Sequence, residues 1–224
     1  MTRLKSGRIQ VALHELRTGP GPTLLLLHEL WGRGTDLTEA AAAWPGGRVL
    51  ALDFAGHGAS DRARGGTYAP ETLSCGADAA LVEAGRAYVA GFGLGAYVAL
   101  LVAGARPDRV PAAYLLPGEG LDGGGSEPDW EMPLETVYEN VAEQLAGAAA
   151  GDDSNGADPM LRSCARDLRP TDYAVAYAER VPRLLLAEDG GERPDWWRAL
   201  HDAPHVEAAP AALADGFAQL LRDA

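Results

Sequence analysis

The chain of 224 residues is poor in cysteine and in positive charge. Its two cysteines, Cys75 and Cys164, are too few for a disulfide framework, and free thiols are typical of a reducing compartment. Only 19 lysines and arginines stand against 32 aspartates and glutamates, which gives a formal net charge of −13. A surface of that sign repels phosphate backbones, so we expect no nucleic-acid partner.

Long apolar runs are also missing. The apolar segments are short and interrupted, so none is long enough to cross a bilayer, and we expect no membrane partner. The N-terminus lacks the basic start, apolar run and small-residue cleavage site of a secretory signal. Together with the free cysteines, these absences predict a cytoplasmic protein. We expect neither a cofactor nor a metal. We expect a small molecule as the ligand or substrate, and the sequence leaves the oligomeric state open.

What the sequence does contain is an alternation of short apolar segments and helical stretches. Strands are predicted at residues 8–16, 23–27, 48–52, 87–90, 112–116, 183–187 and 205–209. Helices are predicted at residues 35–44, 71–84, 96–105 and 211–222. Continuous apolar strands that alternate with helices indicate the α/β class, with a mostly parallel sheet that is covered on both faces.

Residues 118–180 interrupt this alternation, because they contain no convincing strand. Helical segments are predicted at 135–150, 159–168 and 171–180, with a polar loop at 151–156. An insertion of this kind between two strands is typical of a small helical lid over a pocket. We therefore expect a core made of residues 1–117 and 181–224, with residues 118–180 as the lid.

Three segments at the ends of predicted strands carry the identity of the fold. Residues 27–32 read Leu-His-Glu-Leu-Trp-Gly, residues 53–61 read Asp-Phe-Ala-Gly-His-Gly-Ala-Ser-Asp, and residues 91–95 read Gly-Phe-Gly-Leu-Gly. Their order and their strand contexts resemble the α/β-hydrolase superfamily. In that superfamily the first segment carries the oxyanion hole, the second reads Asp-x-x-Gly-His-Gly-x-Ser, and the third is the nucleophile elbow Gly-x-Ser-x-Gly. The resemblance implies an α/β-hydrolase fold over the whole chain.

The elbow lacks its nucleophile. In an elbow, a strand turns sharply into a helix so that one side chain projects above the sheet, and flanking glycines permit the tight turn. Gly91 and Gly95 keep those flanking positions, but Gly93 stands where the family has serine. Because glycine has no side chain, it can neither attack a carbonyl carbon nor hold an acyl group.

The resemblance also implies an acid after a late strand and a histidine after the last one. Asp189, or its neighbour Glu188, follows the strand at 183–187 and resembles the acid. The loop that should carry the histidine is missing, because Pro210 follows the last predicted strand directly. Two of the three triad roles are therefore empty, which argues against ordinary ester hydrolysis.

The remaining histidines do not fill the gap. His201 precedes the last predicted strand and His205 begins it, so both lie on the wrong side of that strand and we expect them on the surface. His28 and His57 match family positions with structural roles.

Part of the catalytic machinery depends only on the backbone. The resemblance places the amides of Leu30 and Leu94 in the oxyanion hole, where they could still bind an anion or a carbonyl oxygen. Glu29 replaces the glycine of the family pattern, and a partly desolvated carboxylate there could act as a general acid or base. A Glu29 that points to solvent, or that forms an ion pair with Arg33, is an equally good interpretation. The side chains expected to line the pocket are those of Trp31, Phe92 and Leu94.

The same glycines permit a second interpretation. Gly91, Gly93 and Ala96 fit the loose dinucleotide fingerprint G-x-G-x-x-G/A, and Glu119 lies after the next strand, where a ribose-binding acid would be sought. The fingerprint normally opens the first βαβ unit, whereas two strand–helix units precede it here.

Three functions therefore remain open. The first is an atypical, non-hydrolytic enzyme that binds a small carbonyl-bearing or apolar metabolite, with Glu29 or Asp189 moving protons. The second is a non-catalytic ligand-binding or interaction protein on a hydrolase scaffold. The third is a nucleotide-cofactor enzyme.

Overall fold

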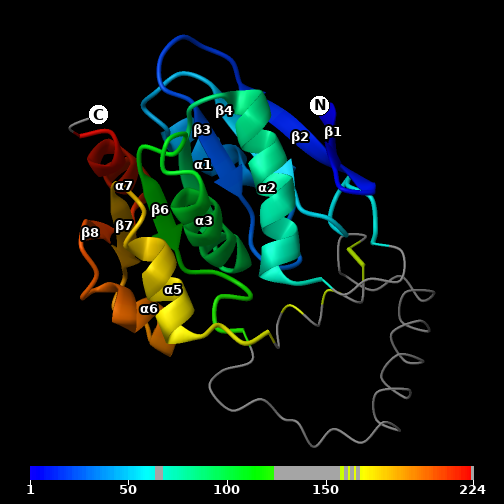
Figure 1. Ribbon diagram of the computed structural model, residues 1–224. Helices are drawn as coiled ribbons and strands as arrows, with labels where there is room; N and C mark the ends of the chain where they lie inside the picture. Colours follow the sequence, from blue (N-terminus) through cyan, green and yellow to red (C-terminus); the bar gives the residue numbers. More distant parts are fainter. Residues whose placement is uncertain (64–67, 124–156, 159–160, 162–163, 165–166, 223–224) are drawn as a thin grey trace, which may run out of the picture.

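The computed structural model describes residues 1–63, 68–123, 157–158, 161, 164 and 167–222 (Figure 1). In these residues, eight strands form a single sheet in the order β1-β2-β4-β3-β5-β6-β7-β8. The first two strands pair antiparallel at one edge, β2 pairs antiparallel with β4, and every later pairing is parallel. The strands are β1 (Thr2–Ser6), β2 (Ile9–Arg17), β3 (Leu24–Leu27), β4 (Val49–Asp53), β5 (Tyr88–Phe92), β6 (Ala113–Leu116), β7 (Leu184–Glu188) and β8 (Val206–Pro210).

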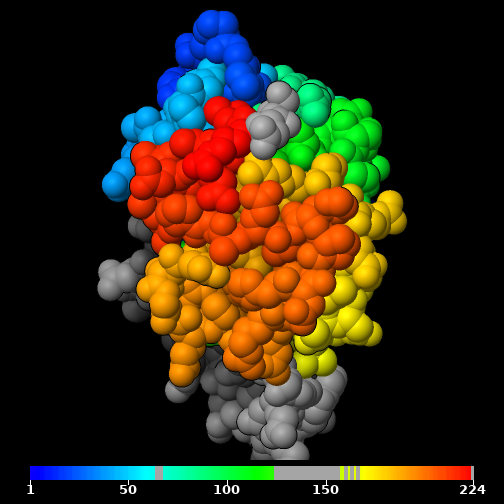
Figure 2. All heavy atoms as spheres, turned by 90° about the vertical axis from the view of Figure 1, so that its left-hand side faces the viewer, coloured from blue at the N-terminus to red at the C-terminus, as the bar shows by residue number. Residues whose placement is uncertain are grey.

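Helices cover both faces of the sheet, as Figure 1 shows. One face carries α2 (Pro70–Ala84), α3 (Leu94–Ala105), α5 (Thr171–Ala178) and α6 (Asp195–Leu200). The other carries α1 (Thr38–Ala43), which follows the 3₁₀ turn η1 (Gly34–Leu37), and α7 (Leu213–Leu220). Figure 2 shows the end of the sheet where β8, α6 and α7 reach the surface, coloured from orange to red. No helix among the described residues is both long and apolar enough to cross a membrane.

The central strands are apolar because both of their faces are buried. All four residues of β3 are leucines without solvent exposure, and their side chains alternate between the two layers of helices. A central parallel strand has no polar face to offer, so its sequence shows a continuous apolar run and not an alternation. The predicted mostly parallel sheet flanked by helices is confirmed.

Two elements were not predicted. The edge strand β1 is mostly exposed and polar, so it lacks an apolar signal. The helix α6 is six residues long, too short to show a period.

The predicted lid falls largely on residues that the structure does not describe. The predicted helix at 135–150 and the polar loop at 151–156 lie outside the described residues, as does most of the segment 159–168. The third predicted helix is present as α5, which packs closely against α3. A methyl group built on Gly104 of α3 would lie 2.6 Å from the carbonyl oxygen of Tyr177. The division into core and lid stays a prediction.

Candidate functional site

The elbow turn is present, and it is built from glycine. β5 ends at Phe92 and α3 begins at Leu94, so Gly93 alone makes the turn, with φ 53° and ψ −117°. The flanking glycines permit close backbone contacts on both sides of it. A Cβ atom at Gly91 would lie 2.0 Å from the carbonyl oxygen of Gly95, and one at Gly95 would lie 2.4 Å from that of Leu27. The backbone therefore has the shape of a nucleophile elbow without a nucleophile.

The space above Gly93 is filled by the chain itself. A Cβ atom at Gly93 would lie 2.1 Å from the backbone carbonyl oxygen of Glu119. The same oxygen accepts hydrogen bonds from the amides of Leu94, at 2.9 Å, and Leu30, at 3.1 Å. These are the two amides that the resemblance assigns to the oxyanion hole. The Glu119 carbonyl thus occupies the position that the resemblance assigns to a substrate oxyanion.

The segment that carries this carbonyl is held from several sides. The amide of Gly93 donates to the carbonyl oxygen of Leu116 at 3.0 Å, which fixes the start of the segment after β6. The amide of Glu119 donates to the Glu29 carboxylate, Oε2, at 2.9 Å. A Cβ atom at Gly118 would lie 2.6 Å from that Oε2, and one at Gly120, where φ is 75°, would lie 2.8 Å from Cβ of Leu30. Glycine at 93, 118 and 120 therefore permits the segment to enter the hole.

Glu29 is half-buried beside the filled hole. Its carboxylate does not pair with Arg33, which instead forms an ion pair with Asp36 at 3.1 Å. Glu29 accepts the hydrogen bond from the Glu119 amide described above. Its role in proton transfer stays a prediction.

The predicted pocket residues pack mainly into the core. The side chains of Leu30 and Leu94 are buried in the cluster on the α2–α3 face of the sheet, and half-buried Trp31 packs against the same cluster. Phe92 packs against the cluster on the opposite face. Trp31 adopts a positive φ of 68°, which belongs to the sharp turn after β3.

The second candidate acid, Asp189, is directed to other partners. It follows β7 and is exposed, its carboxylate accepts from the Gly191 amide at 2.9 Å, and it forms an ion pair with Arg193. The Gly191 hydrogen bond, followed by the Arg193 guanidinium, holds the pKa of the Asp189 carboxyl below its usual range. Among the described residues, no hydrogen bond or ion pair joins Asp189 to Glu29.

The four histidines considered as candidates are either exposed or buried. His201 and His205 are exposed. The link between β8 and α7 consists of Ala211 and Ala212. His28 and His57 are buried, and their rings meet edge-on at 4.7 Å.

Burial also keeps both of these rings neutral. It lowers the pKa of His28 to about 4, and burial followed by the neighbouring His28 lowers the pKa of His57 even further. Nε2 of His28 accepts from the Phe54 amide at 3.1 Å, so Nδ1 carries the proton and donates to the carbonyl oxygen of Glu29 at 2.6 Å. His28 therefore ties the oxyanion-hole loop to the end of β4.

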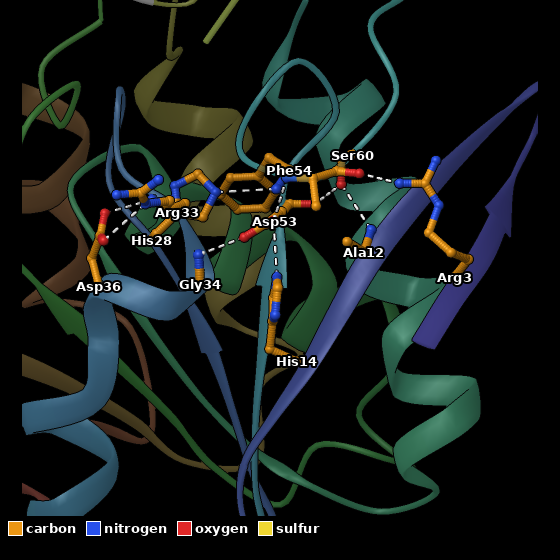
Figure 3. A network of polar contacts seen from close by, with 11 residues as sticks. Arg3, Ala12, His14, His28, Arg33, Gly34, Asp36, Asp53, Phe54 and Ser60 are labelled. Atoms are coloured by element: carbon orange, nitrogen blue, oxygen red, sulfur yellow. Dashed lines mark hydrogen bonds and ion pairs between the residues drawn. The ribbon is translucent and has the colours of Figure 1, made fainter. Parts of the chain in front are cut away.

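The Asp-x-x-Gly-His-Gly-x-Ser segment forms a network of hydrogen bonds with neighbouring elements (Figure 3). Buried Asp53 accepts from the amides of Gly34 and Ala59, at 2.7 and 2.8 Å, and from Nε2 of His14 at 2.9 Å. The Ser60 hydroxyl donates to the Asp53 carbonyl oxygen at 2.6 Å and accepts from the Ala12 amide at 2.8 Å. These bonds join β2, β4 and η1 beneath the hole.

Among the described residues, the Gly93 and Leu94 amides of the glycine loop already donate within the chain, so they are not free to bind a dinucleotide. The Leu94 amide, at the start of α3, would face a pyrophosphate, but it donates to the Glu119 carbonyl oxygen. Glu119 itself contributes its backbone to the site, whereas sequence reasoning had considered only its side chain. The signal that could have revealed this role is the pair of glycines that flank it, Gly118 and Gly120.

No family model matches the chain, and no curated protein does. Solved structures do. The thioesterase domain from the curacin biosynthetic pathway has a TM-score of 0.71 at 17% identity, covering 98% of this chain and 96% of that one. An α/β hydrolase from Sphaerobacter thermophilus DSM 20745 has a TM-score of 0.62 at 21% identity, covering 92% and 91%. The bottromycin epimerase BotH, in complex with bottromycin A2, has a TM-score of 0.63 at 20% identity, covering 98% and 94%.

These similarities confirm that the chain has the α/β-hydrolase fold. At such identities they establish the fold, and the activity must be argued from the site.

Proposed function

We propose that this chain is a non-hydrolytic, ligand-binding protein built on the α/β-hydrolase fold. The observation that carries the proposal is the carbonyl oxygen of Glu119, which accepts from both oxyanion-hole amides, of Leu30 and Leu94. A substrate carbonyl would have to displace it before it could be polarised. A buried amide pair that is already satisfied offers little free energy to a second acceptor.

The other parts of a serine hydrolase are missing in the same place. Gly93 has no nucleophile, and a serine at this position would put its Cβ atom within 2.1 Å of the Glu119 oxygen. His201 and His205 are exposed, His28 and His57 are buried, and Asp189 pairs with Arg193. Because nucleophile, base and acid act as one unit, the loss of two members together with a filled hole favours binding over hydrolysis.

A second function is favoured by one contact. The Glu29 carboxylate holds the Glu119 amide at 2.9 Å, so a carboxylate and two oxyanion-hole amides converge on the same short segment. If residues 118–120 withdraw, these groups would face a ligand carbonyl together. A carboxylate base beside an oxyanion hole is the arrangement that removes a proton from the carbon next to a carbonyl. BotH, a neighbour in fold, is an epimerase, so this fold also hosts a reaction without bond cleavage by water.

The proposal is tested by measuring hydrolysis of p-nitrophenyl acetate and butyrate with purified wild-type chain and with Gly93→Ser. We expect turnover at the buffer rate for both, because the variant gains a hydroxyl without a base to activate it. Reaction with a fluorophosphonate probe should leave both proteins unlabelled. Saturable ester turnover by the wild type, or labelling of residue 93 in the variant, would refute the proposal.

The second function is tested by hydrogen exchange in small carbonyl compounds. Wild type and Glu29→Gln are incubated in D₂O with a panel of ketones, esters and amides, and loss of the C–H signal next to the carbonyl is followed by NMR. The substitution retains an acceptor for the Glu119 amide, so the fold should persist. Exchange catalysed by the wild type and abolished by Glu29→Gln would establish the proton-transfer function in place of simple binding.

A further inference from the structure

Buried polar atoms without partners gather at one place outside the elbow. Among the described residues, four buried side-chain polar atoms have no hydrogen-bond partner, and three of them belong to Tyr97, Asp167 and Arg169. The guanidinium carbon of Arg169 lies 5.0 Å from the centre of the Tyr97 ring. Native structures leave few such atoms, so a cluster of three indicates a site where something else supplies the partners.

Arg169 is the central member of this cluster. It is 7% exposed, and none of the ion pairs among the described residues includes it. It donates from one terminal nitrogen to the carbonyl oxygen of Leu121 and from the other to that of Cys164, at 3.5 Å. A guanidinium has five N–H groups, so most of its donor capacity is unused. Asp167 and Asp122 attract the guanidinium without forming an ion pair with it, and burial still lowers its pKa, so an anion bound directly to it would stabilise its charge.

Arg169 also forms part of the wall of a pocket. The pocket has a volume of about 610 Å³ and lies between the segment that precedes α5 and the loop that leads into α6. In Figure 2 these segments, yellow and orange, lie beside each other. Apolar walls come from Leu168, Pro170, Pro194 and Trp196. A volume of this size lies within the range of about 300–1,000 Å³ that is typical of small-molecule sites.

Acidic groups at the pocket restrict the charge of its ligand. Asp195 pairs with Arg198, and Arg193 pairs with Asp189, so these two arginines are neutralised. The carboxylates of Asp122 and Glu192 also line the pocket. They repel any anion, and the repulsion grows with its charge, so a monoanion that pairs directly with Arg169 is favoured over a polyanion such as a nucleotide.

From these observations we infer that the pocket binds a small monocarboxylate with an apolar or aromatic body. The carboxylate pairs with the guanidinium of Arg169, whose planar donors suit that group, and the body lies against Trp196 and the prolines. The inference deepens the proposed ligand-binding function and rests on it for its biological meaning. It gives that function a site that is separate from the elbow.

The test measures binding of acids and of their neutral amides to the full chain by calorimetry. The probes are 3-phenylpropionate, phenylacetate and hexanoate, each paired with its primary amide. Leu168→Glu adds a negative charge at a pocket residue that is 44% exposed. Val82→Glu makes the same change on α2, at a residue that is 61% exposed and outside the pocket.

We expect at least one acid to bind the wild type and to bind tighter than its amide by on the order of tenfold or more. Leu168→Glu should weaken binding of the acid by a similar factor, and Val82→Glu should leave that binding unchanged. Arg169→Lys, if it folds, should also weaken the acid, because lysine lacks the planar pair of donors. The inference is overturned if no acid binds below about 1 mM, if the amides bind as well as the acids, or if Leu168→Glu has no effect. Ester hydrolysis at the elbow would refute the proposed function and leave these binding results unaltered.

Discussion

Replacing Gly93 by alanine tests whether the Glu119 carbonyl fills the hole. At φ 53° and ψ −117°, any residue with a Cβ atom is strained, at a cost of about 1–3 kcal/mol. The new methyl group would also lie 2.1 Å from the Glu119 oxygen, so the carbonyl must withdraw. The amides of Leu30 and Leu94 would then lose their acceptor, at about 1–3 kcal/mol each if they remain buried. We expect Gly93→Ala to lower the free energy of unfolding by about 3–9 kcal/mol.

The chain contains a matched control for the strain. Gly85, which ends α2, has a similar backbone conformation, with φ 82° and ψ −108°, and nothing lies within 4 Å of its ideal Cβ position. Gly85→Ala therefore measures the strain without the clash, about 1–3 kcal/mol. Gly76, inside α2, has only ordinary contacts, and Gly76→Ala should be neutral or stabilising by about 0.5–1 kcal/mol.

Equilibrium urea denaturation of the three variants and the wild type gives these differences. Amide hydrogen exchange gives a second readout, because the Leu30 and Leu94 amides should be protected in the wild type and exchange faster in Gly93→Ala. If Gly93→Ala costs no more than Gly85→Ala and leaves both amides protected, the Glu119 carbonyl does not occupy the hole and the proposed function loses its basis.

Three other perturbations probe the groups around the hole. Because burial lowers the pKa of His28 to about 4 while the unfolded chain titrates near 6.5, the unfolded state binds a proton first as the pH falls. Stability that is complete above about pH 6.5 should therefore decline toward pH 4, with about 3 kcal/mol due to His28, as measured by urea denaturation at a series of pH values. Asp53→Ala should destabilise by about 3–5 kcal/mol, because it leaves the amides of Gly34 and Ala59 and the ring of His14 without their acceptor, and exposed Asp189→Ala, measured in parallel, should cost far less. Glu29→Ala should cost about 1 kcal/mol through the lost Glu119 hydrogen bond, while Glu29→Gln should cost less, as measured by urea denaturation.

Much of the fold could be predicted because local patterns and tertiary structure agree. The four leucines of β3 and the apolar segment of β5 are buried on both faces, and a strand in that position needs a continuous apolar sequence. The glycines of the elbow follow from backbone contacts that no larger residue permits. The edge strand β1 escaped prediction because it is held by pairing with β2, and an exposed strand shows no apolar signal.

The candidate site could be predicted only in part. The empty nucleophile position follows directly from Gly93, and the two amides follow from their places after β3 and β5. The occupant of the hole could not be predicted, because the contact joins Glu119 to Leu30 and Leu94 across three separate loops and uses a backbone carbonyl. A backbone carbonyl has no residue type of its own, so the sequence carries only the indirect signal of the flanking glycines, Gly118 and Gly120. Arg169 was missed for a related reason, since its burial depends on tertiary packing.

A serine side chain at position 93 and the Glu119 carbonyl require the same volume, so the fold can contain one or the other. The two amides of the hole are products of the turns after β3 and β5, and they persist whatever residue occupies the elbow. Buried amides need acceptors. In this chain Glu119 supplies one oxygen to both amides, and glycines at 118 and 120 let the segment approach closely enough to do so. Restoring serine alone would therefore displace the carbonyl and leave the amides unsatisfied without supplying a base. On the proposed function, ester hydrolysis would therefore require concerted change at the elbow, at residues 118–120 and in the link between β8 and α7.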